Sequence, residues 1–231
     1  MHTKVITHAT KYKEETGYGH MFHNFTEKTT LLTNTEVFSS FLGLKEIIIR
    51  PNLGLLPHLH KNETLIIVNL SGTLAQRSIL NESTIIPKDT IQLIEYKEGS
   101  HFEYNMDKST TIHCLAFILT SKNEKNISEL FTLSSDKNRL SMVFENSVTN
   151  TKKQTISFYQ GVFDKNKTKT YHFGPIKSGF ICYLYSGELL LEHNVVLKEK
   201  DTVALWDKNS LSFTVTQDSR FFILKISDIL E

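Results

Sequence analysis

The chain has 231 residues, of which 39% are apolar and 22% charged, a composition typical of a folded globular protein and not of a disordered or membrane chain. Its 26 Lys and Arg against 25 Asp and Glu leave a formal charge of +1, which excludes a strong overall field for nucleic acid or an anionic membrane. No apolar stretch of signal-peptide or membrane-span length occurs. We therefore expect a soluble, cytoplasmic monomer without nucleic-acid or membrane partners.

Short runs rich in Ile, Leu, Val, Phe and Thr recur along most of the chain, separated by Gly, Asn, Asp, Lys and Pro. This pattern is typical of an all-β sandwich or barrel. In chain order, strands are expected at residues 44–50, 63–70, 83–87, 90–96, 111–119, 155–163, 179–185, 188–197, 202–206, 211–216 and 220–226.

The best helix candidate is Ser121–Leu130, which falls between two strand-rich halves. We therefore expect an N-terminal barrel over residues 1–120, a connection over 121–140 and a C-terminal barrel over 141–231. Cys114 and Cys182 each lie inside an apolar run, so both are expected to be buried thiols without a disulfide.

The two halves share an internal repeat of turn signals. Ser71-Gly72 is followed by Lys88-Asp89-Thr90, and Ser186-Gly187 is followed by Lys200-Asp201-Thr202, with strands between the turns in both copies. A glycine can supply the positive φ of a tight hairpin, and an Asp can close a turn onto its own backbone. This order suits a small jelly roll, and two copies predict two stacked jelly-roll β-barrels.

Candidate metal ligands lie on two segments of the first copy. In His58-Leu59-His60 the alternation of a strand points both imidazoles to one face, and His101-Phe102-Glu103 does the same for an imidazole and a carboxylate. Three imidazoles and one carboxylate suit Fe(II), Mn, Ni, Cu or Zn, and leave positions open for water, O₂ or a substrate oxygen. We predict a metal site formed by His58, His60, His101 and Glu103.

The second copy tests whether such ligands follow from the fold alone. Counted from its own Gly187 and Asp201, the ligand positions fall on Phe173, Pro175, Phe213 and Val215. None of these can bind a metal, so we expect one metal per chain and a C-terminal barrel that is metal-free.

Four other histidines are assigned no ligand role. His172 and His193 lie near the equivalent positions of the second copy but off the offsets, and they are expected to be ordinary surface histidines or histidines with satisfied hydrogen bonds. His20 and His23 could approach the site from the N-terminal segment, but surface or packing roles are favoured.

At its metal motifs the chain resembles the pirin family. The family's motif His-Pro-His-Arg-Gly-Phe-Glu-Thr, followed by a strand and Glu-Gly, aligns without a gap to His58-Leu59-His60-Lys61-Asn62-Glu63-Thr64 and the strand that leads to Ser71-Gly72. Its second motif, Pro-Gly-Asp followed by His-x-Glu, aligns to Pro87-Lys88-Asp89 and His101-Phe102-Glu103. The likeness extends from about residue 40 to the end and departs at Lys61-Asn62-Glu63-Thr64, Lys88 and the stretch before His101.

The resemblance implies a bicupin with iron in the N-terminal cupin and none in the C-terminal one. Described family members include quercetin 2,3-dioxygenases and iron-dependent transcriptional co-regulators. We therefore expect an Fe(II) dioxygenase acting on quercetin or a related aromatic enol, with Glu103 also able to take the substrate's hydroxyl proton as a catalytic base. Two alternatives stay open. One is a non-catalytic iron-dependent redox sensor with a protein partner, and the other is a metal-dependent isomerase of small molecules.

Overall fold

The structure, a computed structural model, describes residues 2–29, 32, 36–78, 83–122, 124–149, 153–173 and 178–228. Within these ranges the chain forms β-strands and the short 3-10 turns His8–Thr10, Glu36–Phe38 and Glu192–Asn194, and no α-helix. Nothing in the described ranges is a helix long and apolar enough to cross a membrane. The all-β prediction is confirmed.

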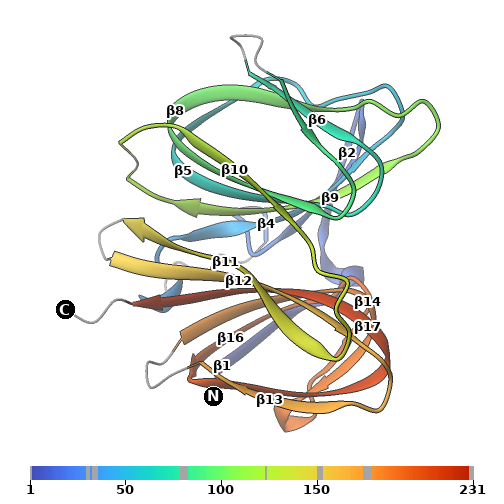
Figure 1. The fold of residues 1–231 in the computed structure, drawn as a ribbon, viewed down its shortest axis with the longest axis vertical. Helices are drawn as coiled ribbons and strands as arrows, with labels where there is room; N and C mark the ends of the chain where they lie inside the picture. Colours follow the sequence, from blue (N-terminus) through green and yellow to red (C-terminus); the bar gives the residue numbers. More distant parts are fainter. Residues whose placement is uncertain are drawn as a thin grey trace. The chain divides into compact units, whose positions relative to one another are not determined.

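The chain divides into two compact units (Figure 1). Residues 12–34 and 39–133 form one unit, called here the N-terminal barrel. Residues 1–11, 35–38 and 134–231 form the other, called the C-terminal barrel.

The N-terminal barrel is one antiparallel sheet with the strand order β2-β3-β4-β9-β5-β8-β6-β7, and β10 pairs with β8. Its strands are β2 (Tyr12–Thr16), β3 (Gly19–Asn24), β4 (Phe41–Ile49), β5 (His58–Asn69), β6 (Leu74–Ser78), β7 (Ser83–Ile86), β8 (Thr90–Asn105), β9 (Ile112–Thr120) and β10 (Ile127–Thr132). In Figure 1 the long β8 curves around one side of this barrel, which lets it pair with β5 along most of its length and with β6 at its end.

Alternating apolar side chains hold this barrel closed. Leu65 and Ile67 of β5 belong to a core of mostly aliphatic side chains, while Ile66 and Val68, which alternate with them, are also buried, on the opposite face. Because β5 is covered on both faces, its sequence is a continuous apolar run and not an alternating one. The same core includes Cys114, whose thiol is buried as expected.

The C-terminal barrel is a second antiparallel sheet with the strand order β1-β16-β14-β17-β12-β11, to which β13 and β15 are added beside β17 and β14. Its strands are β1 (His2–Ile6), β11 (Arg139–Thr149), β12 (Lys153–Phe163), β13 (Thr168–His172), β14 (Ser178–Leu191), β15 (Val196–Lys198), β16 (Thr202–Lys208) and β17 (Ser210–Asp228). Cys182 lies in its core and is also buried.

The division of the chain differs from the expected boundaries at two places. The N-terminal residues belong to the C-terminal barrel, because β1 pairs with β16 over Ile6↔Thr202 to His2↔Trp206. The expected helix over Ser121–Leu130 is wrong: Ile127–Thr132 forms β10, which pairs with β8 in the N-terminal barrel. A short segment of mixed polarity carries too little periodicity to distinguish a helix from a strand. Here the edge of β8 offers backbone hydrogen bonds, and the segment pairs with it as a strand.

The repeated turns have the backbone that their residues suggested. Gly72 and Gly187 have φ values of 68° and 92°, a region that glycine reaches without strain. In the C-terminal turn a carboxylate oxygen of Asp201 accepts a hydrogen bond from the backbone N–H of Lys198. The copies differ in detail, since Gly187 lies inside β14 at a register shift, while Gly72 stands between two strands.

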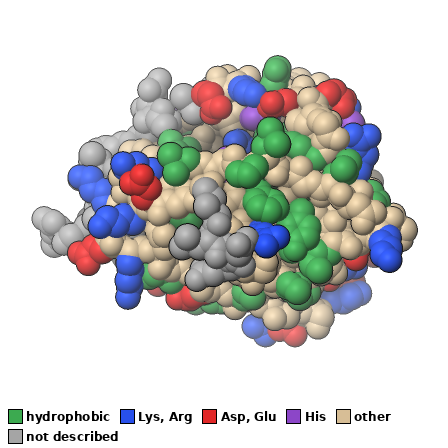
Figure 2. Space-filling model, turned by 90° about the horizontal axis from the view of Figure 1, so that it is seen from above, with side chains coloured by type: hydrophobic (Ala, Val, Ile, Leu, Met, Phe, Trp, Pro, Cys, Tyr) green, Lys and Arg blue, Asp and Glu red, His purple; other side chains and the backbone are tan. Residues whose placement is uncertain are grey.

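The surface carries charges of both signs. On the face drawn in Figure 2, basic and acidic side chains are interspersed around the rim, and hydrophobic side chains gather nearer the centre. This pattern matches the near-zero net charge of the sequence.

Candidate metal centre

Two neighbouring strands bring the predicted ligands together. His58 and His60 lie at the start of β5, and His101 and Glu103 lie near the end of β8. The register places His58 directly opposite His101. As the alternation of a strand requires, both imidazoles of β5 point to one side, while Leu59 between them is 66% exposed.

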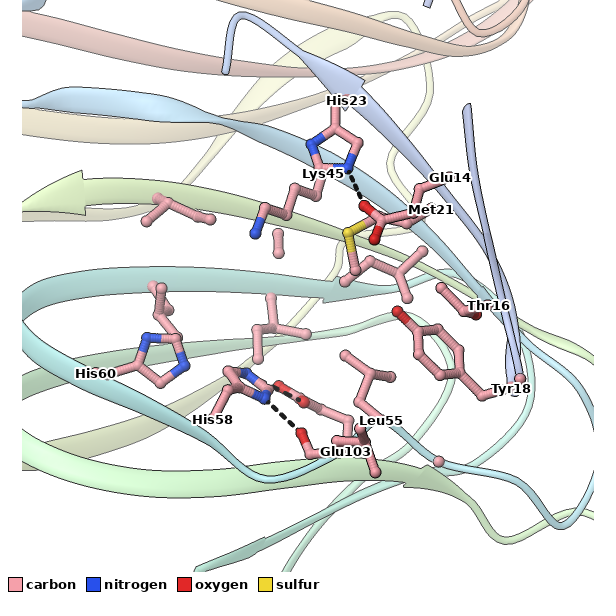
Figure 3. Close-up of a pocket in the computed structure, with 18 of the residues that line it drawn as sticks. Glu14, Thr16, Tyr18, Met21, His23, Lys45, Leu55, His58, His60 and Glu103 are labelled. Carbon is pink, nitrogen blue, oxygen red and sulfur yellow. Dashed lines mark hydrogen bonds and ion pairs between the residues drawn. The ribbon is translucent and has the colours of Figure 1, made fainter. Parts of the chain in front are cut away.

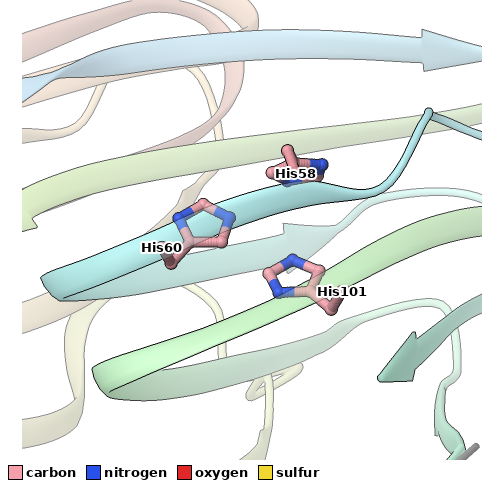
Figure 4. A group of neighbouring side chains, drawn as sticks. All are labelled: His58, His60 and His101. Carbon is pink, nitrogen blue, oxygen red and sulfur yellow. The ribbon is translucent and has the colours of Figure 1, made fainter. Parts of the chain in front are cut away.

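The three imidazoles form a compact cluster (Figure 4). Each can offer one ring nitrogen, and these nitrogens lie within 4.8 Å of one another. The ring centroids of His60 and His101 are 4.7 Å apart, as are those of His58 and His60. His60 and His101 are buried, and His58 is half-buried at the cavity.

The Nδ1 atom of each imidazole is held by a protein group. Nδ1 of His58 is 2.9 Å from the backbone carbonyl oxygen of Leu56, and Nδ1 of His60 is 2.6 Å from a carboxylate oxygen of Glu63. Nδ1 of His101 is hydrogen-bonded to the hydroxyl of Tyr96. These contacts fix the ring orientations and leave Nε2 as the ligand atom, which is how metal-binding histidines are commonly supported.

Glu103 lies against the Nε2 atoms of His101 and His58. One carboxylate oxygen is 2.7 Å from Nε2 of His101, and the other is 3.7 Å from Nε2 of His58. Burial by itself would raise the pKa of Glu103, but the hydrogen bond from His101 and the nearby imidazoles outweigh it and lower the pKa. The carboxylate is therefore charged at neutral pH. Burial also lowers the pKa of His58, which favours the neutral form that binds a metal.

Two buried atoms of the cluster have no hydrogen-bond partner among the residues that the structure describes: Nε2 of His60 and the second carboxylate oxygen of Glu103. A buried polar atom without a partner is costly, and such atoms are rare in folded proteins. A cation between the imidazoles and the carboxylate would satisfy both atoms. The residues present therefore fit a divalent metal, and the three imidazoles with one carboxylate suit a transition metal.

The cluster opens into a cavity of about 710 Å³ inside the N-terminal barrel. Its wall is mostly apolar and includes Met21, Ile47, Leu55, Leu65, Ile67, Ala116 and Ile118. Figure 3 shows His58, His60 and Glu103 on one side of this space, and Tyr18, Glu14, His23 and Lys45 on the other. A cavity of this size and polarity suits a small organic ligand.

The four histidines that were assigned no ligand role lie at the surface or pack in the barrel. His20 is near the surface with its Nδ1 beside Glu15, and His172 and His193 are exposed. His23 is buried and donates from Nε2 to Glu14 at a distance of 3.0 Å. It also lines the cavity, which the sequence alone did not indicate.

Three of the positions that replace the ligands in the second copy pack into the C-terminal barrel. Phe213 and Val215 are members of its buried core, and Phe173 packs against that core. Pro175 lies outside the described residues. Large apolar side chains therefore fill the places that ligands take in the first copy.

Sequence reasoning did not find Glu63 and Tyr96, which hold two of the imidazoles. Glu63 stands where the pirin motif has Phe, and so it looked like a departure of no consequence for the metal. Glu63 comes three residues after His60 and contacts its ring. The residue between them in the motif's glycine position, Asn62, has a φ of 53°, in the left-handed region.

Comparisons with known proteins agree with this architecture. Residues 146–226 match the family model of the quercetinase C-terminal cupin domain. A search of curated proteins found no match. The nickel(II) complex of the bacterial pirin YhhW from Escherichia coli superposes with a TM-score of 0.83 at 14% identity, covering 99% of this chain and 100% of that one.

A crystal structure of quercetin 2,3-dioxygenase from Acinetobacter baumannii superposes with a TM-score of 0.74 at 12% identity, covering 97% of this chain and 85% of that one. At these identities the superpositions establish the fold and leave the activity open. Residues 146–226 are thus similar to a quercetinase C-terminal cupin domain, and the chain has the two-barrel fold of the bacterial pirin.

Proposed function

We propose that the protein is a metal-dependent dioxygenase of the quercetinase type, with Fe(II) held by His58, His60, His101 and Glu103. One observation carries this proposal. The cluster of three imidazoles and one carboxylate, two of whose buried atoms have no hydrogen-bond partner among the described residues, opens into a mostly apolar cavity of about 710 Å³. The substrate class is an aromatic enol such as quercetin. Support comes from the quercetin dioxygenase with the same fold.

When bound, the metal would supply a Lewis-acid and redox centre at which oxygen chemistry can take place. The chain's own groups have separate roles. Leu56, Glu63 and Tyr96 orient the three imidazoles through their Nδ1 atoms. The apolar wall binds the aromatic rings and excludes water, which strengthens electrostatic interactions inside the cavity.

Glu103 has a second role in this proposal, as the base that accepts the proton of the substrate's enol hydroxyl. Its carboxylate faces the cavity and is only 5% exposed, and it would take the proton through an oxygen that does not hold the metal. A carboxylate that is charged and poorly solvated can accept a proton readily from an acidic enol placed against it.

The cavity favours catalysis over the alternative of a redox sensor. A sensor needs a partner surface and a metal but no space for a ligand, whereas a flavonol needs several hundred cubic ångströms. The isomerase alternative would use the same cavity but would consume no oxygen, and so oxygen uptake separates it from the proposal.

The test is oxygen consumption by the Fe(II)-loaded protein with quercetin. We expect uptake that depends on both iron and quercetin and that is lost in Glu103→Ala. The matched control is Glu98→Ala, which changes an exposed carboxylate on the same strand that forms an ion pair with Lys61. Absence of uptake by protein that holds one equivalent of redox-active iron would refute the dioxygenase and favour the sensor.

Metal content tests the site independently of turnover. His60→Ala and Glu103→Ala are expected to lose the single equivalent bound by the wild type, while His172→Ala, an exposed histidine of the C-terminal barrel, keeps it. Full retention by both site variants would contradict the ligand assignment.

A further inference from the structure

Lys45 is a basic side chain on the wall of an otherwise largely apolar cavity. It lies on β4, between His23 of β3 and Ala116 of β9 in the register of the sheet, and it is half-buried. In Figure 3 its side chain extends into the cavity and its amino group points away from Glu14.

Three carboxylates line the cavity: Glu27 is exposed to solvent, Glu103 lies among the histidines, and Glu14 is already neutralised by other partners. Glu14 accepts a hydrogen bond from Nε2 of His23 at 3.0 Å and one from the amino group of Lys28 at 2.6 Å. Of the two lysines that line the cavity, Lys28 thus has a counter-ion, whereas Lys45 makes no ion pair with any residue in the part of the chain that the structure describes.

An ammonium group in an apolar cavity without a counter-ion has lost part of its hydration and gained little in return. The charge of Lys45 acts on the neighbouring His23. Burial is the main cause that lowers the pKa of His23, and the positive charges of Lys45 and Lys28 lower it further. A bound anionic group would remove this imbalance. The cavity is therefore complementary to a ligand that is mostly apolar and carries one negative charge.

The charges of the cavity also set the direction of such a ligand. In the metal-free protein Glu103 stands at the histidine side and would repel a carboxylate there, but it can accept a proton from a hydroxyl. Lys45 attracts the carboxylate to the other side. A hydroxyl at one end and a carboxylate at the other end of an aromatic ring system meet both requirements.

We infer that Lys45 is a specificity-determining residue that selects a carboxylated aromatic substrate, binding its carboxylate while the enol hydroxyl faces Glu103 and the histidines. This inference rests on the proposed function, because it takes the same cavity as the substrate site. It goes further in naming an acidic substrate class instead of a neutral flavonol.

The test uses two fluorescent probes of the same shape, 6-hydroxy-2-naphthoate and its neutral amide, 6-hydroxy-2-naphthamide. Dissociation constants are measured by fluorescence titration with the full chain, both metal-free and metal-loaded. Because a hydrogen bond to a charged partner is stronger than a neutral one, we expect the wild type to bind the carboxylate about tenfold more tightly than the amide.

Lys45→Met is expected to abolish this preference by weakening the carboxylate about tenfold and leaving the amide unchanged, while Lys45→Arg retains it. Lys88→Met is the matched control, since Lys88 is an exposed lysine of the same barrel outside the cavity lining. If Lys45→Met does not fold, Lys45→Gln and the wild-type preference decide the question.

Equal affinities of the wild type for the two probes would overturn the inference, as would an unchanged preference in Lys45→Met. Oxygen uptake with quercetin is recorded separately. Uptake without a Lys45-dependent preference would refute the inference and leave the dioxygenase standing. A Lys45-dependent preference without uptake would refute quercetin as the substrate and support the acidic ligand class.

Discussion

Glu63 offers a sharp test of how the metal centre is supported, because it contacts a proposed ligand without being one. Its carboxylate oxygen is 2.6 Å from Nδ1 of His60, whose other nitrogen is buried and has no hydrogen-bond partner. Replacing Glu63 by Leu removes the acceptor and frees the ring to rotate. Loss of such an outer partner typically weakens metal binding by about 10- to 100-fold.

The exposure of Glu63 narrows this range. Its side chain is 25% exposed, so water screens part of the interaction and can replace part of the hydrogen bond. We therefore expect Glu63→Leu to weaken Ni(II) binding by about tenfold, which corresponds to about 1.4 kcal/mol. Glu63→Gln keeps an acceptor oxygen and should lose less.

The assay is a competition titration of Ni(II) between the protein and a chelator of known affinity. Glu98→Gln provides the control, because it alters a carboxylate of the neighbouring strand β8 that is 57% exposed and contacts no ligand. If Glu63→Leu binds Ni(II) as tightly as the wild type, or if Glu98→Gln weakens binding equally, the assigned role of Glu63 is wrong.

Three further outcomes are expected. Burial lowers the pKa of His23, so as the pH falls below 6.5 the unfolded chain binds a proton before the folded one does. The free energy of unfolding measured in urea should therefore decrease less steeply on acidification in His23→Gln than in the wild type. The pKa of His58 is lowered in both proteins and does not affect the comparison, and identical slopes would contradict the prediction. In Gly161→Ala the new Cβ would lie 2.3 Å from the buried ring of Phe221, so thermal unfolding should show a loss of about 1–3 kcal/mol, and an unchanged melting temperature would speak against it. Phe213→Ala should cost about 3–5 kcal/mol of unfolding free energy yet leave one metal equivalent bound, and loss of metal from the folded variant would refute a purely structural role.

The sequence predicted the features that depend on local pattern. The period of two in His58-Leu59-His60 was enough to place both imidazoles on one face, and the apolar runs were enough to predict strands. Glycines at the two turns predicted positive φ correctly. Each of these inferences uses only the geometry of a few consecutive residues.

What could not be predicted depends on which strands become neighbours. The role of Tyr96 requires the bend of β8 that returns its hydroxyl to His101 five residues later. The sequence assigned no role to Glu63 or Lys45, because their places beside His60 and on the cavity wall follow from the three-dimensional fold. The paired strands β1 and β16 are separated by almost the whole length of the sequence, so no pattern of neighbouring residues indicates that they pair.

That pairing has a consequence for the order in which the protein can be made. During synthesis β1 leaves the ribosome first, but its partner β16 follows roughly 200 residues later, at about 5–20 residues per second. The N-terminal barrel can close in the meantime, because its strands lie within residues 12–133. Until β1 adds to it, β16 is an open sheet edge, the kind of surface through which nascent chains aggregate.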